Sequence, residues 1–347
     1  MPESLFIIIE ALVKGVVFLI YLLTTAALTV WLERRVAAVA QDRLGPNRTG
    51  PFGLLQPFAD VFKLFFKEDT IPAAADKTIH SIAPIISVAV AALLYTVVPF
   101  AHYVEIGGRI IYLGIAPNVN IGVLFILGMT SIGVYSFTLA GWTSSNKYSM
   151  LGGLRSSAQM ISYEIAMGMA IVSVVMVCGS LGTNDLILHQ AGWKWNVFLQ
   201  PIAFLIYFTA ALAEINRTPF DFPEAEQELV AGYNTEYSSM RFGMFFLAEY
   251  ANVATSAIIM VVLFFGGWQL PFVEWQDLGF ADGSIITALL QVMVTIAKVV
   301  VLVFVIIWIR LSIPRFRYDQ LMRLGWHILL PLGLLNLVVT AFVIYFM

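Results

Sequence analysis

The chain has 347 residues, of which 60% are hydrophobic and only 12% are charged, and its formal net charge at pH 7 is −3. An average soluble domain carries about 25% charged residues, so this composition excludes an ordinary soluble enzyme, and the absence of a basic excess excludes a nucleic-acid partner. The single cysteine, Cys178, excludes a disulfide framework, a cysteine-based zinc site and an iron–sulfur cluster held by this chain.

The class that remains is an all-α polytopic membrane protein with one integral membrane domain over 1–347. About eight hydrophobic segments are long enough to cross the hydrocarbon core, which is ~30 Å thick. The first exceeds the apolar stretch of a signal peptide and has no small-residue cleavage site after it, so we expect a retained helix. The predicted spans cover 6–32, 80–101, 119–141, 159–181, 197–215, 243–269, 285–309 and 326–346.

The distribution of basic residues predicts the orientation of these spans. Four loops on one side of the membrane contain 15 of the 19 Lys and Arg residues, whereas the opposite loops contain only Arg109 and Lys194. Cytoplasmic loops of membrane proteins are enriched in Lys and Arg, so we expect the basic loops to be cytoplasmic and both termini to face outward. The basic loops cover 33–79, 142–158, 216–242 and 310–325.

Segment 51–67, PFGLLQPFADVFKLFFK, lies in the first basic loop and is too polar to be a span. Gln56, Asp60, Lys63 and Lys67 recur at helical spacing on one side, while apolar residues occupy the other. This pattern predicts an amphipathic helix in the plane of the membrane interface. The helix is either a connector that rests on the membrane or the wall of a lateral opening for a lipid-like substrate.

Four glutamates are predicted to converge at one depth, in the inner third of the membrane. Glu33 closes the first span, Glu214 ends the fifth, and Glu164 and Glu249 lie near the inner ends of the fourth and sixth. Ionisable residues within spans usually face a polar interior, and clustered carboxyl groups can carry protons. The alternative is that each glutamate makes a structural hydrogen bond at the interface.

The seventh span carries a polar stripe made of Thr287, Gln291, Thr295 and Lys298 on one helix face. Lys298 falls near mid-membrane, where an ionisable side chain is a candidate for a proton path. Hydrogen bonding between helices is the alternative for such a stripe. His80, at the inner end of the second span, is expected to be an ordinary interfacial histidine.

Five stretches carry a family resemblance. They are ERRVAAVAQDRLGPNRTGPFGLLQPFADVFKLFFKE (33–68), GWTSSNKYSMLGGLRSSAQMISYE (141–164), AEINRTPFDFPEAEQELVAGYNTEYSSMRF (213–242), AEYAN (248–252) and PRFRYDQLM (314–322). In this order they resemble the membrane subunit of bacterial proton-translocating NADH:quinone oxidoreductase (respiratory complex I) that adjoins the hydrophilic arm, which is homologous to membrane subunit 1 of the mitochondrial enzyme. The resemblance covers nearly the whole chain and leaves out only the outer loops 102–118 and 182–196.

This resemblance implies a role in quinone reduction and proton translocation. The family subunit forms much of the ubiquinone chamber with the quinone-site subunits of the peripheral arm, and it begins a chain of charged residues that leads to antiporter-like subunits. It implies that this chain binds no cofactor or metal, that ubiquinone is the substrate, and that flavin and Fe–S clusters reside in partner subunits. Small membrane subunits and lipids are further expected partners, in the bacterial inner membrane.

The resemblance also assigns glutamates to the proton path. They are Glu164, Glu214, Glu249 and Glu33, with Glu224, Glu226 and Glu228 as the link from the quinone chamber, and the mid-membrane position of Lys298 makes it the next candidate on the path. Residues in the inner loops beside the predicted entry are our candidates for the chamber lining, namely Arg34, Asp60, Arg217, Asp221, Arg315 and Arg317, with Ala59 and Phe62 of the amphipathic segment at the access groove. The alternative for each arginine is docking to a peripheral subunit.

Two other functions share part of this pattern. A homologous subunit of a membrane-bound hydrogenase, or of another quinone-linked dehydrogenase, has the same charged core, but the long 216–242 loop and the full 51–67 segment favour the quinone enzyme. A proton-coupled secondary transporter usually has two similar halves, and we find no repeat of 1–170 in 171–347.

Overall fold

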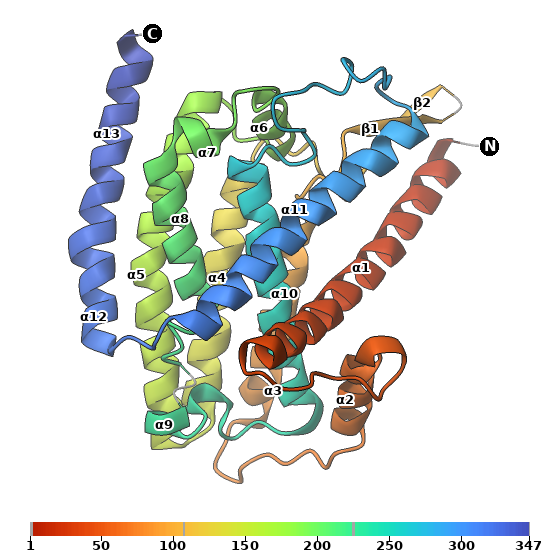
Figure 1. Cartoon of the computed structure of the whole chain (residues 1–347). Helices are drawn as coiled ribbons and strands as arrows, with labels where there is room; N and C mark the ends of the chain where they lie inside the picture. Colours follow the sequence, from red (N-terminus) through yellow and green to blue (C-terminus); the bar gives the residue numbers. More distant parts are fainter. Residues whose placement is uncertain (1–2, 107, 224–225, 347) are drawn as a thin grey trace.

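The computed structural model describes residues 3–106, 108–223 and 226–346, which form a bundle of long helices (Figure 1). Seven helices in this part are long and apolar enough to cross a membrane. An eighth, α8 (Pro201–Glu214), is shorter and follows directly on the single turn α7 (Asn196–Leu199). The seven are α1 (Glu3–Ala40), α3 (Lys77–Thr96), α4 (Gly122–Thr143), α5 (Lys147–Cys178), α10 (Ser239–Phe264), α11 (Ile285–Ser312) and the continuous helix Tyr318–Phe346.

Each predicted span falls on one of these helices, which confirms the all-α membrane architecture. Three boundaries differ clearly from the prediction, and one of them is the start of the last span, which lies at Tyr318 rather than near 326. α1 continues to Ala40, so Glu33 and Arg34 lie within a helix and the inner loop begins after it. α5 begins at Lys147 rather than near 159, so the polar stretch before the predicted span is also helical. The Asn146 side chain caps this helix start, because it accepts a hydrogen bond from the Tyr148 N–H at 3.0 Å.

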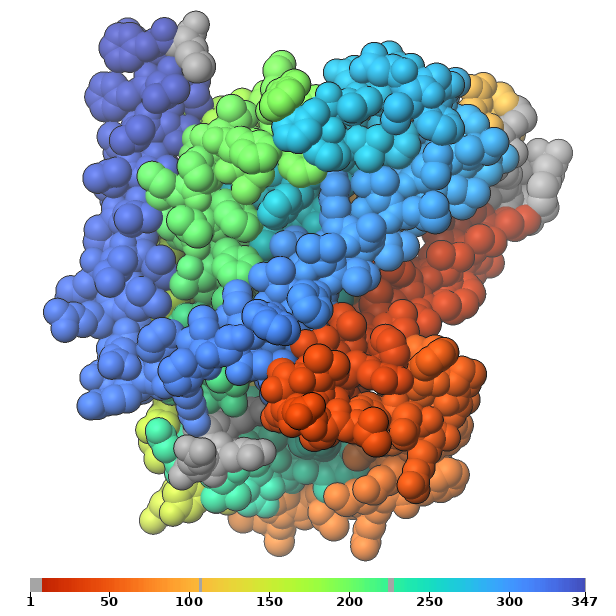
Figure 2. Space-filling model, in the orientation of Figure 1, coloured from red at the N-terminus to blue at the C-terminus, as the bar shows by residue number. Residues whose placement is uncertain are grey.

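α10 is the central helix of the bundle. It packs against α1, α3 and α11, and nearly all of its residues from 253 to 264 are buried. α1 and α11 are inclined relative to the upright α5 and α8, and α11 crosses the face of the molecule as a broad band (Figures 1 and 2). The last span, made of α12 (Tyr318–Arg323), a π-helical stretch (Leu324–Leu329) and α13 (Leu330–Phe346), flanks α5.

The two ends of the bundle carry different structures. The start of α1 and the end of α13 lie at one end, and α2 (Gln56–Phe65) and α9 (Glu226–Leu229) lie at the other (Figure 1). The end with α2 and α9 carries the basic loops, so we name it the inner end.

The outer end contains structure that the sequence pattern did not indicate. Strands β1 (Tyr103–Ile106) and β2 (Arg109–Tyr112) form an antiparallel hairpin, so the outer loop 102–118 is not helical. Helix α6 (Thr183–His189) lies in the next outer loop. These elements are small, and the fold remains all-α in its membrane part.

Short elements at the inner end hold the loop 216–242 against the bundle. The turns η1 (Pro51–Gly53) and η2 (Gly232–Asn234) belong to the two long inner loops. α5 and η2 touch backbone to backbone, since a Cβ atom on Gly152 would lie 2.7 Å from the Cα of Gly232. Any larger residue at Gly152 would push this loop away from α5.

Candidate functional site

An apolar cavity opens between α1, α2 and α10 near the inner end, and we name it the lateral cavity. Its volume is about 330 Å³, and nearly all of its lining side chains are apolar. Drug-sized organic ligands occupy pockets of this size and character. The lining residues are Leu23, Ala26, Ala27, Val30, Pro57, Phe58, Asp60, Val61, Leu64, Met240, Gly243, Met244, Phe246, Leu247 and Tyr250.

The one charged residue in that lining is held by a polar network at the α1–α2 contact. Asp60 pairs with Arg34 at 2.7 Å, and Gln56 Nε2 donates a hydrogen bond to the Asp60 carboxylate at 3.1 Å. Thr49 Oγ1 in turn donates to Gln56 Oε1 at 2.5 Å. The structure therefore places both Arg34 and Asp60, two of the predicted chamber residues, at this cavity.

The predicted access residues on α2 need a correction. Ala59 and Phe62 are exposed on the far face of α2 and do not line the lateral cavity. The cavity side of α2 consists of Pro57, Phe58, Asp60, Val61 and Leu64. The sequence pattern separated polar from apolar residues, but it could not show which part of the apolar arc turns toward α1 and α10.

A buried ion-pair network, which we name the arginine cluster, adjoins this cavity. Arg217 Nε lies 2.7 Å from a carboxylate oxygen of Glu249, and Arg217 Nη1 lies 3.8 Å from Glu33. Arg310 also pairs with Glu33. The Arg217 guanidinium lies over the ring of Tyr250 at 4.3 Å. Tyr250 therefore contacts both the lateral cavity and the arginine cluster.

The charge on Arg217 is secured by its neighbours. The side chain of Arg217 is only 8% exposed, and burial by itself would lower the pKa of the guanidinium, but the charge of Glu249, with Tyr250 and Glu33, raises that pKa above its usual value. Glu249 and Glu33 are 12% and 17% exposed. Two of the four predicted path glutamates are thus neutralised by arginines.

The chain turn after α8 directs Arg217 into the bundle. Asn216 takes the left-handed conformation (φ 56°), which ends the helix and which asparagine tolerates better than most residues. Gln159 Nε2 on α5 donates hydrogen bonds to the carbonyl oxygens of Ala213 at 2.7 Å and Phe220 at 2.8 Å. This buried glutamine therefore fixes the start of the loop to α5.

The other two glutamates lie in a different environment. Glu214 lines a small cavity of about 40 Å³, which we name the polar cavity, together with residues of α3, α4, α5 and α10. Glu164, close enough for its charge to act on Glu214, accepts a hydrogen bond from Ser131. Among the described residues neither carboxylate forms an ion pair with a lysine or arginine.

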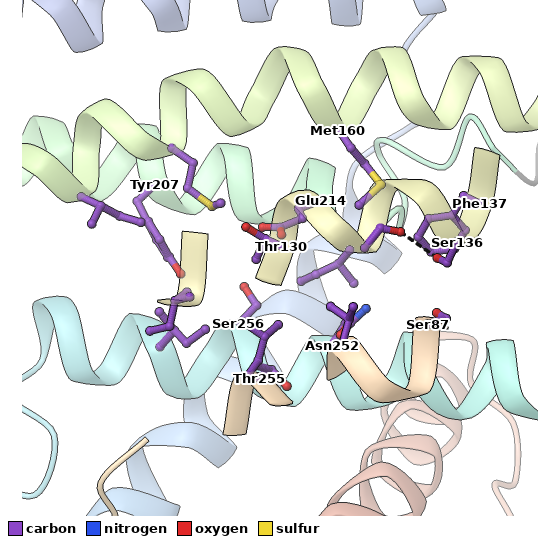
Figure 3. Close-up of a pocket in the computed structure, with 18 residues that line it drawn as sticks. Ser87, Thr130, Ser136, Phe137, Met160, Tyr207, Glu214, Asn252, Thr255 and Ser256 are labelled. Carbon is purple, nitrogen blue, oxygen red and sulfur yellow. Dashed lines mark hydrogen bonds between the residues drawn. The ribbon is translucent and has the colours of Figure 1, made fainter. Parts of the chain in front are cut away.

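The polar cavity has room for water. A water molecule needs about 10–15 Å³ of such volume and two to four polar partners, so this cavity holds about two or three. Figure 3 shows Glu214 and Thr130 across the cavity from Asn252, Thr255 and Ser256 of α10. Asn252 Oδ1 and Ser256 Oγ are buried without a hydrogen-bond partner among the described residues, so they are available to water.

Lys298 lies apart from both glutamate pairs. Its Nζ donates hydrogen bonds to the carbonyl oxygens of Phe265 (2.8 Å), Gly267 (2.8 Å) and Gln269 (2.5 Å), directly after α10. It also lies 4.5 Å from the ring of Trp195. In the described chain no carboxylate pairs with it. Lys298 therefore caps the outer end of α10, where a cation is favoured by the helix dipole.

The rest of the polar stripe on α11 is also structural. Gln291 Oε1 accepts a hydrogen bond from the His102 N–H at 3.0 Å, and Thr295 Oγ1 donates to the Phe100 carbonyl at 3.0 Å. Both side chains are buried. The stripe thus attaches α11 to the chain after α3, as the alternative of helix–helix hydrogen bonding expects.

The loop between α8 and α10, which we call segment 215–238, carries the remaining predicted residues. Glu228 pairs with Arg155 on α5 at 2.6 Å, and this hydrogen bond lowers the pKa of Glu228. Asp221 is half-buried. Glu224 lies outside the described residues, and the same holds for the side chain of Glu226, which begins α9.

The two predicted arginines before α12 behave differently. Arg315 lies over the ring of Phe222 at 5.1 Å, so it packs on segment 215–238. Arg317 is 80% exposed and pairs only locally, with Asp319 at 3.2 Å. Neither residue lines the lateral cavity. Docking to a neighbouring subunit, the alternative for the arginines, fits Arg317 better than lining a chamber does.

Sequence reasoning missed several residues that organise this site. Arg310 was counted only as a basic loop residue, and Tyr250, Gln159 and Ser131 were not assigned to it. The polar spacing on α10, where Glu249, Asn252 and Ser256 recur on one face, is visible in the sequence, but it does not point to these four residues. Among the described residues no group of three His, Cys, Asp or Glu side chains is arranged to hold a metal ion.

Comparisons with known proteins agree with the predicted resemblance. A family model described as NADH dehydrogenase matches residues 13–341. NADH-quinone oxidoreductase subunit 8 of Rhodothermus marinus is 51% identical over 92% of this chain and 93% of that protein. The corresponding NADH-quinone oxidoreductase subunit of Geobacter metallireducens is 49% identical (97% and 96%), and that of Flavobacterium johnsoniae is 44% identical (99% and 97%).

Proposed function

Because this chain belongs to the NADH dehydrogenase family, as a membrane subunit of an NADH-quinone oxidoreductase, we propose that it forms part of the quinone chamber and begins the proton path. The lateral cavity admits the apolar tail of a ubiquinone from the membrane. Quinone reduction withdraws protons and so changes the net charge near the arginine cluster, and the cluster responds to that change. Glu164 and Glu214 carry protons away from it.

The observation that carries this proposal is the position of Tyr250. Its side chain lines the lateral cavity, and its ring lies 4.3 Å from the Arg217 guanidinium. An apolar tail in the cavity would therefore end beside a buried cluster of two arginines and two glutamates. Buried charges interact more strongly than charges in water, since the effective dielectric is lower.

The coupling follows from the proton balance of the reaction. Reduction of a quinone to a quinol takes up two electrons and two protons. Proton withdrawal near the cluster changes its net charge by whole units, and a unit charge at ~4 Å is worth about 4 kcal/mol at an effective dielectric of 20. Arg217 begins segment 215–238, which reaches α5 through Gln159 and Arg155, so a charge change at Arg217 acts on the helices that carry the polar cavity.

The electrons come from partner subunits in this proposal. As a complex I subunit the chain works with other subunits of the same complex, and we expect the flavin and Fe–S clusters to reside in the peripheral arm. Antiporter-like membrane subunits would receive the proton path, and the complex would lie in the bacterial inner membrane. This chain contributes binding, orientation and charge, and it holds no redox group of its own.

A matched pair of substitutions tests the lateral cavity. Ala27→Trp fills the cavity with an indole, whereas Ala59→Trp adds the same side chain on the exposed face of α2. We expect A27W to lower quinone reductase activity with a long-tailed quinone more than with a short-tailed analogue, and A59W to leave both rates near those of the parent. Equal loss with both quinones in A27W would contradict the access role.

A further inference from the structure

His80 is a buried histidine that its surroundings do not explain. It lies in the first turn of α3, its side chain is fully buried, and neither Nδ1 nor Nε2 has a hydrogen-bond partner among the described residues. Its ring stacks on Tyr237 at a centroid distance of 4.0 Å and an angle of 7°. Buried polar atoms almost always have a partner, so two open ring nitrogens indicate a bound water or a role in proton transfer.

Charged groups from the inner end face His80. Asp69 and Arg241 form an ion pair at 3.3 Å, and both act electrostatically on the imidazole. Glu236, which accepts a hydrogen bond from Asn146 at 2.6 Å, acts on it as well. The Asp69 side chain is 43% exposed, so it is in contact with solvent at the inner end.

The same face of α3 leads from His80 to the polar cavity. Ser87 is seven residues further on the same face of α3, about 10 Å along the helix, and it lines that cavity with Glu214. A row of rings fills the space between them. Tyr237 contacts His80 and Phe245, Phe245 contacts Phe137, and Phe137 lines the cavity (Figure 3).

We propose that His80 carries protons between the inner aqueous face and the polar cavity at Glu214. The proposal rests on the proposed function, since it supplies the protons that the path at Glu214 moves. A neutral imidazole has one accepting and one donating nitrogen, so it can accept a proton from a hydronium ion of the inner aqueous face on one nitrogen and release the other proton toward the cavity. The ring is then neutral with its proton on the opposite nitrogen, and a flip of the ring restores the starting arrangement.

The row of aromatic rings between His80 and the polar cavity blocks this proton route. Phe137 and Phe245 belong to the helices, whereas Tyr233 and Tyr237, which contact them, belong to segment 215–238. Arg217, near the start of that segment, belongs to the arginine cluster. Its displacement on quinone reduction would separate the rings and let water connect His80 with the cavity.

Two substitutions of His80 test the proposal in the assembled complex. H80F keeps a flat ring for the stack on Tyr237 but has no nitrogen, and H80Q keeps polar atoms but cannot titrate. We expect both to lower quinone reductase turnover about a hundred-fold at matched complex content, the lower end of the range for a positioned proton-transfer group, and to enlarge the slowing by D₂O. Electron transfer from NADH to an artificial acceptor should stay unchanged.

A matched control and a reference variant separate the outcomes. His102 also stacks on an aromatic ring, Trp268, but lies at the outer end, so H102F should keep the parent rate. Full turnover in H80F would show that the stack is all that matters, and full turnover in H80Q would show that titration is not needed; either overturns the proposal. E214Q is measured in parallel: if E214Q is impaired and H80F is not, the proposed function stands and only the role of His80 is lost.

Discussion

Two pairs of glutamates lie at a similar depth in this protein but in opposite chemical settings. Glu33 and Glu249 face Arg217 and Arg310 in a buried ion-pair network. Glu214 lines a small cavity, and Glu164, whose charge acts on Glu214, accepts a hydrogen bond from the Ser131 hydroxyl. A carboxylate bound to arginine is held in its charged form, whereas one among hydroxyls and water can bind and release a proton. Depth alone therefore does not define a proton path.

The largest expected effect comes from removing the arginine of the first pair. R217M leaves Glu249 buried and without the Nε contact at 2.7 Å. Breaking a buried ion pair by removing one partner costs about 3–5 kcal/mol, so we expect little assembled complex and a lower thermal midpoint. Native electrophoresis and thermal unfolding measure this. The exposed Lys194 of the opposite, outer loop provides the control, and K194M should assemble normally; normal assembly of R217M would show that the arginine cluster is not needed for the stability of the complex.

Lys298 provides a second buried charge whose partners are backbone carbonyls. K298M removes three hydrogen bonds to the end of α10. Hydrogen bonds to a charged group contribute about 1.5–3 kcal/mol, so we expect reduced thermal stability of the complex. Turnover per assembled complex should change little. A loss of turnover at unchanged stability would instead support the prediction from the sequence that Lys298 belongs to the proton path.

The two glutamate pairs should differ in turnover. E214Q preserves the shape of the polar cavity and removes its carboxyl group, so we expect about hundred-fold slower quinone reduction in a complex that assembles normally. E249Q leaves Arg217 with Glu33, and we expect a smaller loss of turnover with a lower stability. Quinone reductase turnover and thermal stability are measured in parallel for both variants at matched complex content. Equal losses of turnover in E214Q and E249Q would contradict the distinction between the two glutamate pairs.

The smallest effect concerns the exposed pair of Glu228 and Arg155. Arg155 lowers the pKa of Glu228 in the folded protein, so the pair stabilises the fold above the unfolded pKa of a glutamate, which is about 4.3. That contribution disappears as the pH falls through the lowered pKa. Since Glu228 is 53% exposed, it is worth less than about 1 kcal/mol. The thermal midpoints of E228Q and the parent should differ slightly at pH 7 and converge in acid; a constant difference would exclude this linkage.

The membrane architecture could be predicted from the sequence because the bilayer fixes the length of a span and the basic loops fix its direction. All eight segments fall on helices. The extension of α5 to Lys147 was not predicted because its first turns are polar and not apolar, and only the Asn146 cap marks the start. The outer hairpin was not predicted because each of its strands has only four residues, which is too short for a strand pattern to be distinguished from a loop.

The convergence of the four glutamates at one depth stays a prediction, and their division into two pairs was not predicted. Helix period gives the depth of a residue along its span, whereas the partner depends on how each helix is rotated in the bundle. Arg217 enters the bundle because the left-handed Asn216 turns the chain back after α8, and composition does not show that turn. For the same reason Ala59 and Phe62 were placed at a cavity from which α2 turns them away.

The central claim is that Glu214 changes protonation during turnover while Glu249 stays a bound carboxylate. The most direct measurement is the infrared difference spectrum of carboxyl groups on quinone reduction, recorded for the assembled parent complex, E214Q and E249Q. The account predicts a band of protonated carboxyl that changes with reduction in the parent and in E249Q and is absent in E214Q. An unchanged band in E214Q, or its loss in E249Q instead, would contradict the account.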